Sequence, residues 1–165
     1  MNAQENDELE NCLALLKSCH SLQLATVDEK GLPHISYAPF IRQREDFFIF
    51  VSQLAGHTQH LQLRPNASIM VIKDETNSRN LFARERCILN VLVETVAPDE
   101  SASILDQMEI ELGKTITLLR TLPDFILFRL TSAQARYVAG FGKAYEVDLI
   151  RNEVVHVSAQ KLAER

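Results

Sequence analysis

Much of the chain is divided into short runs of β-forming residues, and this pattern limits the possible folds more than any other feature. The first two runs, Leu22–Val27 and His34–Ile41, are separated by a polar segment that ends in Gly31, a residue free to adopt positive φ, so they are predicted to form a hairpin. Further runs of this kind are Phe47–Ser52, Ala67–Lys73, Arg86–Ala97, Asp124–Thr131 and Arg136–Asp148. Strands and helices do not alternate regularly, which argues against a doubly wound parallel sheet. The pattern predicts a mainly β (α+β) fold, in which about six or seven strands form an antiparallel barrel with helices at its edges.

Helical periodicity is confined to a few segments. Leu9, Cys12, Leu13, Leu16 and Cys19 recur at helical spacing and predict a helix over about 7–19. Three further helices are predicted: 56–64, which Pro65 ends, 98–112, which Pro98-Asp99 begins, and 114–122. Gly140 and Gly142 predict a bulge or sharp bend within the last long strand, and residues 149–165 are predicted to form a strand and then a short helix.

Length and composition are those of one ordinary globular domain. The 165 residues carry a net charge of −5, and 46% of them are hydrophobic. No repeat or linker interrupts them, so we expect a single domain over 1–165, with a barrel over about 20–148 and a tail over 149–165. The mild acidity argues against a nucleic-acid partner.

The cysteines and the charged residues indicate in which cellular compartment the protein is expected. Three cysteines form no CxxC motif, and Cys12 and Cys19 are interpreted as small apolar residues on one helix face rather than as a disulfide or metal pair. The uncharged stretch 47–63 is too polar for a membrane span, and the acidic N-terminus is unlike a targeting signal, so we expect a cytoplasmic protein with no membrane partner.

Common nucleotide-binding, hydrolase and zinc-protease motifs are absent from the sequence, so candidate site residues must come from local patterns. A small-residue loop from Ser52 leads into the predicted helix at Gly56, where free N–H groups favour an anion. His57 and His60 share one face of that helix, and either a metal pair or one functional histidine fits the spacing. Asp124 enters an apolar strand, where a carboxylate needs a partner such as histidine or else lies exposed at the strand end. Arg79, Arg84 and Arg86 suit acidic groups at the mouth of a cleft.

Several strings resemble a known family. Residues 24–40 (LATVDEKGLPHISYAPF) and 57–68 (HTQHLQLRPNAS) are similar to the opening hairpin and to a helix-to-strand segment of pyridoxamine 5′-phosphate oxidase-like split barrels. Within that superfamily, residues 74–84, 124–130 (DFILFRL) and 137–144 (YVAGFGKA) resemble the haem-utilisation branch. The similarity covers about residues 20–148.

This resemblance implies an antiparallel Greek-key split barrel that forms a homodimer, with a planar cofactor between the subunits. Haem is slightly favoured over FMN, because Gly56, His57 and Cys87 depart from the flavin oxidases at positions that contact FMN. The expected function is haem or tetrapyrrole binding and utilisation, with oxidative haem degradation by means of a separate electron donor as one form of it. The alternatives are an FMN-dependent oxidoreductase and a non-catalytic binding module.

The resemblance also implies roles for individual residues. His57 and Asp124 are the expected catalytic pair, and His156 is a candidate ligand of the haem iron. The residues expected to bind the cofactor are Ser36, Tyr37, Ser52, His57, Thr58, Arg84 and Arg86.

Overall fold

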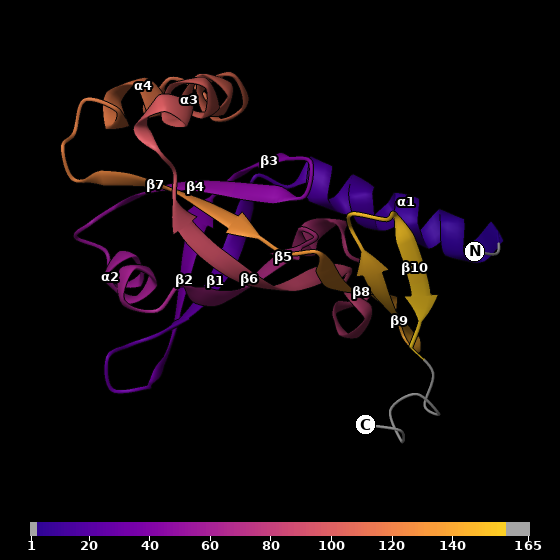
Figure 1. Ribbon diagram of the computed structural model, residues 1–165. Helices are drawn as coiled ribbons and strands as arrows, with labels where there is room; N and C mark the ends of the chain where they lie inside the picture. The colour runs from indigo at the N-terminus through magenta and orange to yellow at the C-terminus, as the bar shows by residue number, and fades with distance from the viewer. Residues whose placement is uncertain (1–2, 158–165) are drawn as a thin grey trace. The chain divides into compact units, whose positions relative to one another are not determined.

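A computed structural model describes residues 3–157 of the chain (Figure 1). They divide into two compact units, each assembled from segments that are distant in the sequence. Unit 1 comprises Met1–Cys19, Met70–Leu89 and Ala133–Arg165, and unit 2 comprises His20–Ile69 and Asn90–Ser132. Strands β5 (Asn66–Ile72) and β6 (Arg86–Thr95) contribute residues to both units.

Antiparallel pairing organises unit 2. Strands β1 (Ser21–Val27) and β2 (Pro33–Pro39) form the expected hairpin, in register from Ser21↔Pro39 to Val27↔Pro33. A second hairpin joins β3 (Ile41–Gln43) to β4 (Asp46–Ser52). On its other side β4 pairs with β7 (Phe125–Thr131), which in turn pairs with β6.

Side chains close the β4–β7 ladder at both of its ends. Asp46 is paired with Thr131 at one end, where the Thr131 hydroxyl donates a hydrogen bond to Asp46 Oδ1 over 2.8 Å. At the other end, Ser52 is paired with Phe125, the residue that follows Asp124. The antiparallel register therefore brings Asp124 to the end of β4.

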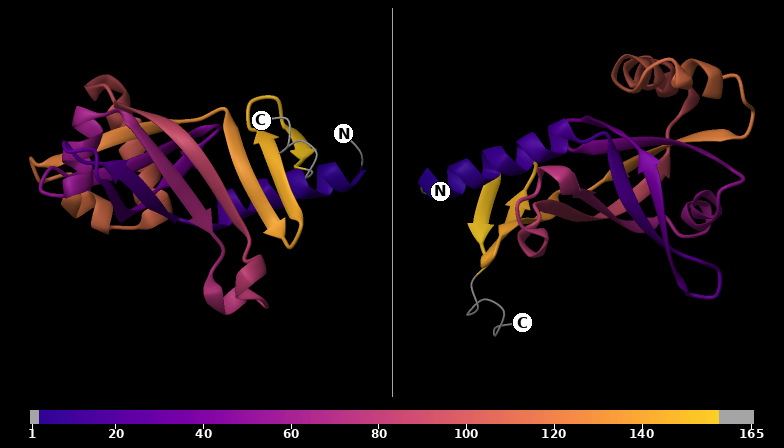
Figure 2. Two further views of the ribbon diagram at one scale, coloured as in Figure 1. Left: turned by 90° about the horizontal axis from the view of Figure 1, so that it is seen from below. Right: turned by 180° about the vertical axis from the view of Figure 1, so that it is seen from behind.

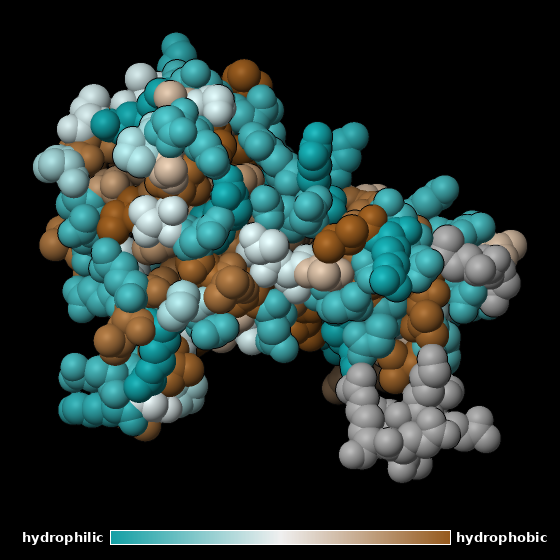
Figure 3. Space-filling view, in the orientation of Figure 1, coloured by the Kyte–Doolittle hydropathy of each residue, from teal (hydrophilic) through white to brown (hydrophobic). Residues whose placement is uncertain are grey.

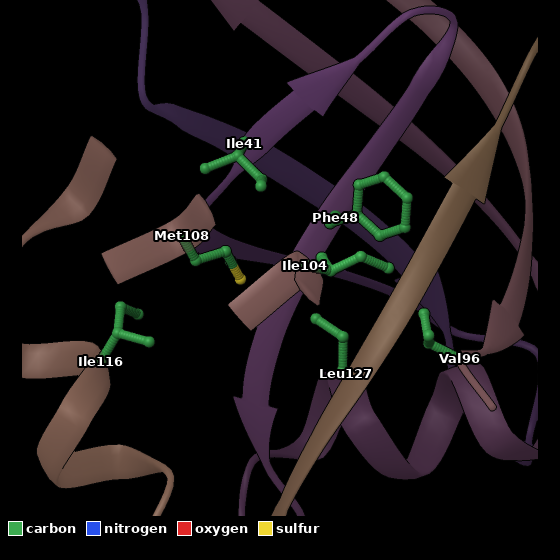
Figure 4. Close-up of a cluster of buried hydrophobic side chains, with 7 residues drawn as sticks. All are labelled: Ile41, Phe48, Val96, Ile104, Met108, Ile116 and Leu127. Atoms are coloured by element: carbon green, nitrogen blue, oxygen red, sulfur yellow. The ribbon is translucent and has the colours of Figure 1, made fainter. Parts of the chain in front are cut away.

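Two helices cover one part of the unit 2 sheet. The start of α3 (Pro98–Leu112) is favoured by Pro98 and by acidic residues in its first turn. A single cap residue, Gly113 at φ 90°, then allows the chain to turn before α4 (Thr115–Leu119). Apolar side chains join both helices to strands β3, β4 and β7 and to Val96, which precedes α3 (Figure 4). These side chains are Ile41, Phe48, Val96, Ile104, Met108, Ile116 and Leu127.

Unit 1 combines one helix with a three-stranded meander. Strands β8 (Gln134–Gly140), β9 (Lys143–Asp148) and β10 (Glu153–His156) are antiparallel neighbours, and helix α1 (Ala3–Ser18) packs against β8 and β10 (Figure 2). The first residues of β6 pair with β8. Two short 3₁₀ turns, η1 (Glu75–Asn77) and η2 (Leu81–Ala83), lie between β5 and β6.

The expected α+β class with antiparallel strands is confirmed, but some details of the prediction were wrong. Ten strands are present within residues 3–157 rather than six or seven, because β3 and β10 are short and the run 136–148 is two strands. The expected bulge is present, as a register shift between Val138 and Gly140 in the pairing of β8 with β9. Gly142, at φ 66°, also forms a tight turn that divides the run into two strands. Helix α1 begins at Ala3, earlier than residue 7.

Two further expectations concern the tail and the membrane. The strand predicted in the tail is β10, whereas the short helix predicted after it falls outside the described residues. No helix within residues 3–157 has the length and apolar character needed to cross a bilayer.

Candidate functional site

The central polar contact of unit 2 joins Ser52 to Asp124. Ser52 Oγ donates a hydrogen bond to Asp124 Oδ2 over 2.5 Å, and the backbone N–H of Gln53 donates to the Asp124 carbonyl over 2.7 Å. Leu54 N–H in turn donates to Ser52 Oγ over 3.1 Å. The predicted catalytic carboxylate is thus half-buried and held by a side chain and a loop that follow β4.

The next residues begin helix α2 (Gly56–Leu63) without a side-chain cap. Thr58 is completely buried, and its hydroxyl donates to the Ser52 carbonyl over 2.6 Å. Ala55, the N-cap residue, has extended backbone and offers no side-chain acceptor to the first turn. Thr58 therefore fixes the path of the loop, while the first N–H groups of α2 have no side-chain cap.

His57 presents an imidazole with an unused nitrogen. Its Nε2 atom is buried and has no hydrogen-bond partner among residues 3–157. Burial lowers the pKa of His57 below the ordinary value of about 6.5, and the nearby His34 and His60 lower that pKa further. The imidazole is therefore mainly neutral at pH 7, and it can accept or donate one more hydrogen bond.

Three histidines gather at the start of α2. His34 on β2 lies edge-on to His60, with ring centroids 5.1 Å apart, and His60 Nδ1 is hydrogen-bonded to the Thr26 hydroxyl over 2.9 Å. A Cβ atom on Gly56 would lie about 4 Å from the Nε2 atoms of both His34 and His60. The absence of a side chain at Gly56 thus leaves room beside these two rings. Even so, residues 3–157 contain no group of three or more His, Cys, Asp or Glu side chains that could hold a metal ion. The structure therefore does not support the hypothesis that His57 and His60 bind a metal together.

A pocket of about 440 Å³ opens beside His57. Its walls are mostly apolar and come from β4, β7, α3 and α4, with Ser52, His57 and Thr115 as polar groups. The lining residues are Pro39, Phe50, Val51, Ser52, Ala55, His57, Leu112, Thr115, Ile116, Leu119 and Phe125. Apolar walls with a few polar groups are typical of sites for flat organic cofactors. A buried imidazole nitrogen without a partner fits a tetrapyrrole edge or another hydrogen-bonding ligand here.

The remaining predicted residues of unit 2 lie on β2. The Ser36 hydroxyl donates to the Leu24 carbonyl over 3.2 Å, so this side chain is occupied within the β1–β2 hairpin. Tyr37 points to the opposite face of the strand and is 61% exposed. Neither residue lines the pocket beside His57.

Arg84 and Arg86 belong to unit 1. Arg84 Nε donates to the Lys73 carbonyl over 2.6 Å, and Arg86 Nη1 donates to the Arg84 carbonyl over 2.8 Å. Both arginines are half-buried, and their hydrogen bonds hold the segment between β5 and β6. Each retains further N–H donors, because a guanidinium has five.

His156 also belongs to unit 1, on β10. Its Nε2 atom is hydrogen-bonded to the Gly142 carbonyl over 2.9 Å, and its ring stands edge-on to Tyr145. Together with Gln4, Glu5 and Tyr145 it lines a second pocket, of about 270 Å³. Since a carbonyl can only accept, the hydrogen bond makes Nε2 the protonated nitrogen and leaves Nδ1 as the atom that could bind a metal.

The sequence model of the pyridoxamine 5′-phosphate oxidase family matches residues 9–139, well over half of the chain. The chain belongs to this family. Within it, the chain is 43% identical over 129 residues to the protein named heme oxygenase HutZ of Vibrio cholerae, an overlap that covers 77% of this chain and 73% of HutZ.

Solved structures of the family agree with this assignment. The crystal structure of V. cholerae HutZ, described as a heme storage protein, is 38% identical, with a TM-score of 0.70 over 74% of this chain and 87% of that one. Campylobacter jejuni ChuZ is 28% identical, with a TM-score of 0.84 over 97% of this chain and 65% of that one. A heme-binding protein of Mycobacterium smegmatis, 21% identical with a TM-score of 0.76, shares the fold. These likenesses confirm the expected split barrel and the HutZ-like branch of the family.

Sequence reasoning gave no role to His34, although it is one of three histidines at the start of α2. The Asp28–Gly31 turn predicts the hairpin, and the hairpin register then pairs His34 with Thr26, the residue that bonds His60. Counting outward from that turn would have paired His34 with Thr26, but only the structure shows that this pair faces α2.

Proposed function

We propose that this chain binds haem and acts in haem utilisation, with His57 as the polar group at the end of the apolar pocket. The observation that carries this proposal is the buried Nε2 of His57, which has no hydrogen-bond partner among residues 3–157, while the ring is mainly neutral at pH 7. Haem is named in the descriptions of HutZ and of the mycobacterial protein. The apolar walls formed by α4 and by β4 and β7 exclude water from the ligand.

We assign separate tasks to the remaining residues. Asp124, held by Ser52, is placed to accept a proton or to orient His57, and Thr58 keeps the connecting loop in position. The free N–H groups of Arg84 and Arg86 suit carboxylate groups such as haem propionates. His156 Nδ1 is the proposed ligand of the iron. Ser36 and Tyr37 do not line the pocket beside His57, so we assign them no contact there.

Oxidative haem degradation is the reaction that we propose for this site. Bound haem would supply the oxygen-activating chemistry, and a separate donor would supply electrons. The protein would then exclude water and hold or release a proton at His57 Nε2. Because HutZ carries both an oxygenase and a storage description, a non-catalytic binding module is the alternative that the experiment must separate.

A second copy of this chain is the proposed partner. Strand β2 exposes Ile35 and Tyr37 by 69% and 61%, and hydrophobic surface lies over the part of unit 2 that contains β2 (Figure 3). Exposed apolar side chains on a strand are typical of a protein interface. A homodimer through β2 would cover them, and Tyr37→Lys would then shift the protein from dimer to monomer in light scattering. A monomeric wild type would exclude the dimer.

Titration with haem tests the proposed function. The wild type should produce an intense Soret band, His57→Ala should bind haem at least tenfold more weakly, and the exposed His20→Ala is the matched control that should bind normally. Addition of a reductant under oxygen then separates the alternatives. Loss of the Soret band with release of iron supports degradation, and a stable complex supports the binding module. No binding of haem, with yellow protein that retains FMN, would overturn the haem proposal.

A further inference from the structure

Two cysteines that are 75 positions apart in the sequence meet inside unit 1. Cys12 lies on α1 and Cys87 on β6, both have 0% exposure, and neither is in a disulfide. Their Sγ atoms are 3.8 Å apart. Cys19, the near neighbour of Cys12 in the sequence, lies elsewhere, with its Sγ 3.9 Å from the Ile72 carbonyl oxygen.

The elements that carry the two sulfur atoms are fixed by their own contacts. In the pairing of β6 with β8, Cys87 stands opposite Tyr137, which is buried and donates a hydrogen bond to Glu85 Oε1 over 2.5 Å. Burial and this bond raise the pKa of Tyr137, so its hydroxyl remains a donor at any ordinary pH. Since α1 packs against β8 as well, the two thiols are held opposite each other.

We propose that Cys12 and Cys87 form a redox modification site, at which a peroxide converts the two thiols into a disulfide that fastens α1 to β6. The S–S bond is about 2.05 Å long, so the sulfur atoms must approach each other by about 1.8 Å. Cysteine has one rotatable bond before its sulfur, so rotations of about 30° at both residues would supply this movement.

The step balances with hydrogen peroxide as the oxidant. The sulfur of one cysteine attacks the peroxide, the O–O bond breaks, and a sulfenic acid and one water are formed. The second thiol then attacks the sulfur of the sulfenic acid, so that the S–S bond forms, the S–O bond breaks and a second water leaves. Two thiols are oxidised, and one peroxide is reduced to two waters.

Access to the pair sets the rate of this reaction. Both thiols are fully buried, so the oxidant reaches them only when α1 opens locally. Cys19 is half-buried and borders a pocket of about 450 Å³ in the same unit. Reagents should therefore modify Cys19 first, and the disulfide should form more slowly.

Peptide mapping of the full-length protein tests the proposal without haem, so its result does not depend on the proposed function. Native protein is treated with hydrogen peroxide, blocked with iodoacetamide and digested with trypsin without reduction. Because Lys17 separates Cys12 from Cys19, and Arg86 precedes Cys87, the three cysteines fall in different peptides. We expect a linked pair formed by peptides 1–17 and 87–114 in the wild type and in Cys19→Ser, and none in Cys87→Ser.

The oxidised wild type should also unfold at a higher guanidinium concentration than the reduced protein, because the cross-link restricts the unfolded chain. Addition of a thiol reductant should reverse this shift. A link between Cys19 and either other cysteine, or a Cys12–Cys87 link that forms only in denatured protein, would overturn the proposal. Since the wild-type peptides alone decide the question, a variant that fails to fold does not affect the outcome.

Discussion

The carboxylate of Asp124 accepts a hydrogen bond from the hydroxyl of Ser52 across the end of the β4–β7 ladder. One oxygen of the predicted catalytic acid is thus committed to a residue that borders the pocket beside His57. Ser52 also accepts from Leu54 N–H and, through its carbonyl, from Thr58. This serine connects the candidate acid to the loop that begins α2.

Replacement of Ser52 by Ala tests that connection. The variant loses a hydrogen bond to a charged group, and we expect its free energy of unfolding to fall by about 1–2 kcal/mol. Urea denaturation measures the change. Ser103→Ala is the matched control, because Ser103 is an exposed residue of α3 whose hydroxyl donates to the Glu100 carbonyl of its own helix, and its effect should be within about 0.5 kcal/mol. Equal effects of the two substitutions would contradict a structural role for Ser52.

Acid should destabilise the protein through His57. Its pKa is lowered in the folded state, so below about pH 6.5 the unfolded chain binds more protons than the folded one. The contribution of His57 to the free energy of unfolding is therefore complete above that pH and is lost as the pH falls. Between about pH 7.5 and about pH 5.5, the free energy of unfolding, measured by denaturation, should fall less in His57→Gln than in the wild type. The exposed His20→Gln should follow the wild type, and a wild-type slope in His57→Gln would exclude this explanation.

Arg129 joins three carboxylates in unit 2. It forms ion pairs with Asp46 over 3.5 Å and with Glu94 over 2.8 Å, contacts Glu100, and lies over the Phe48 ring. The hydrogen bonds to Glu94 and Glu100 raise the pKa of Arg129, which therefore remains charged. Arg129→Met should lower the free energy of unfolding by about 1 kcal/mol, and less at high salt, because the site is partly exposed. Arg79→Met, at an exposed position of unit 1, should have no measurable effect on stability.

The packing of α3 can be tested on two faces of the same helix. Met108 is 1% exposed within the apolar cluster, so Met108→Ala should cost about 2–4 kcal/mol. Ile110, two residues further along, is 77% exposed, and Ile110→Ala should cost less than about 1 kcal/mol. Guanidinium denaturation compares the two variants. A larger loss for Ile110→Ala would mean that α3 packs through the opposite face.

Local signals in the sequence were sufficient for many elements. Pro65 marked the end of α2, Pro98 marked the start of α3, and the turn at Gly31 identified the first hairpin. The run 136–148 was predicted as one strand with a bulge, and the structure has both a bulge between Val138 and Gly140 and a turn at Gly142 that divides the run. The turn was missed because glycines inside β-forming residues fit a bulge as well as a tight turn, and only the pairing partners distinguish the two. Such partners depend on long-range register, which local propensity does not encode.

Individual residues of the candidate site could be predicted from the sequence, but the hydrogen bonds between them could not. His57 and Asp124 were found from their neighbours, and the family resemblance singled them out. The bond that Ser52 gives to Asp124 follows from a register between residues 72 positions apart. The approach of Cys12 to Cys87 depends in the same way on how α1 packs against the sheet of unit 1, and the spacing of the cysteines contains no information about that.

The β4–β7 ladder has a side-chain hydrogen bond at each end, Thr131 with Asp46 at one and Ser52 with Asp124 at the other. Strands usually fray from their ends, where each amide is protected only by its neighbour. Here an end can open only after a side-chain bond has broken, so the amides of this ladder should exchange their hydrogens with solvent late and nearly together. Replacement of Asp124 should therefore make the amides of β4 and β7 exchange faster, beginning at the end where Ser52 bonds Asp124.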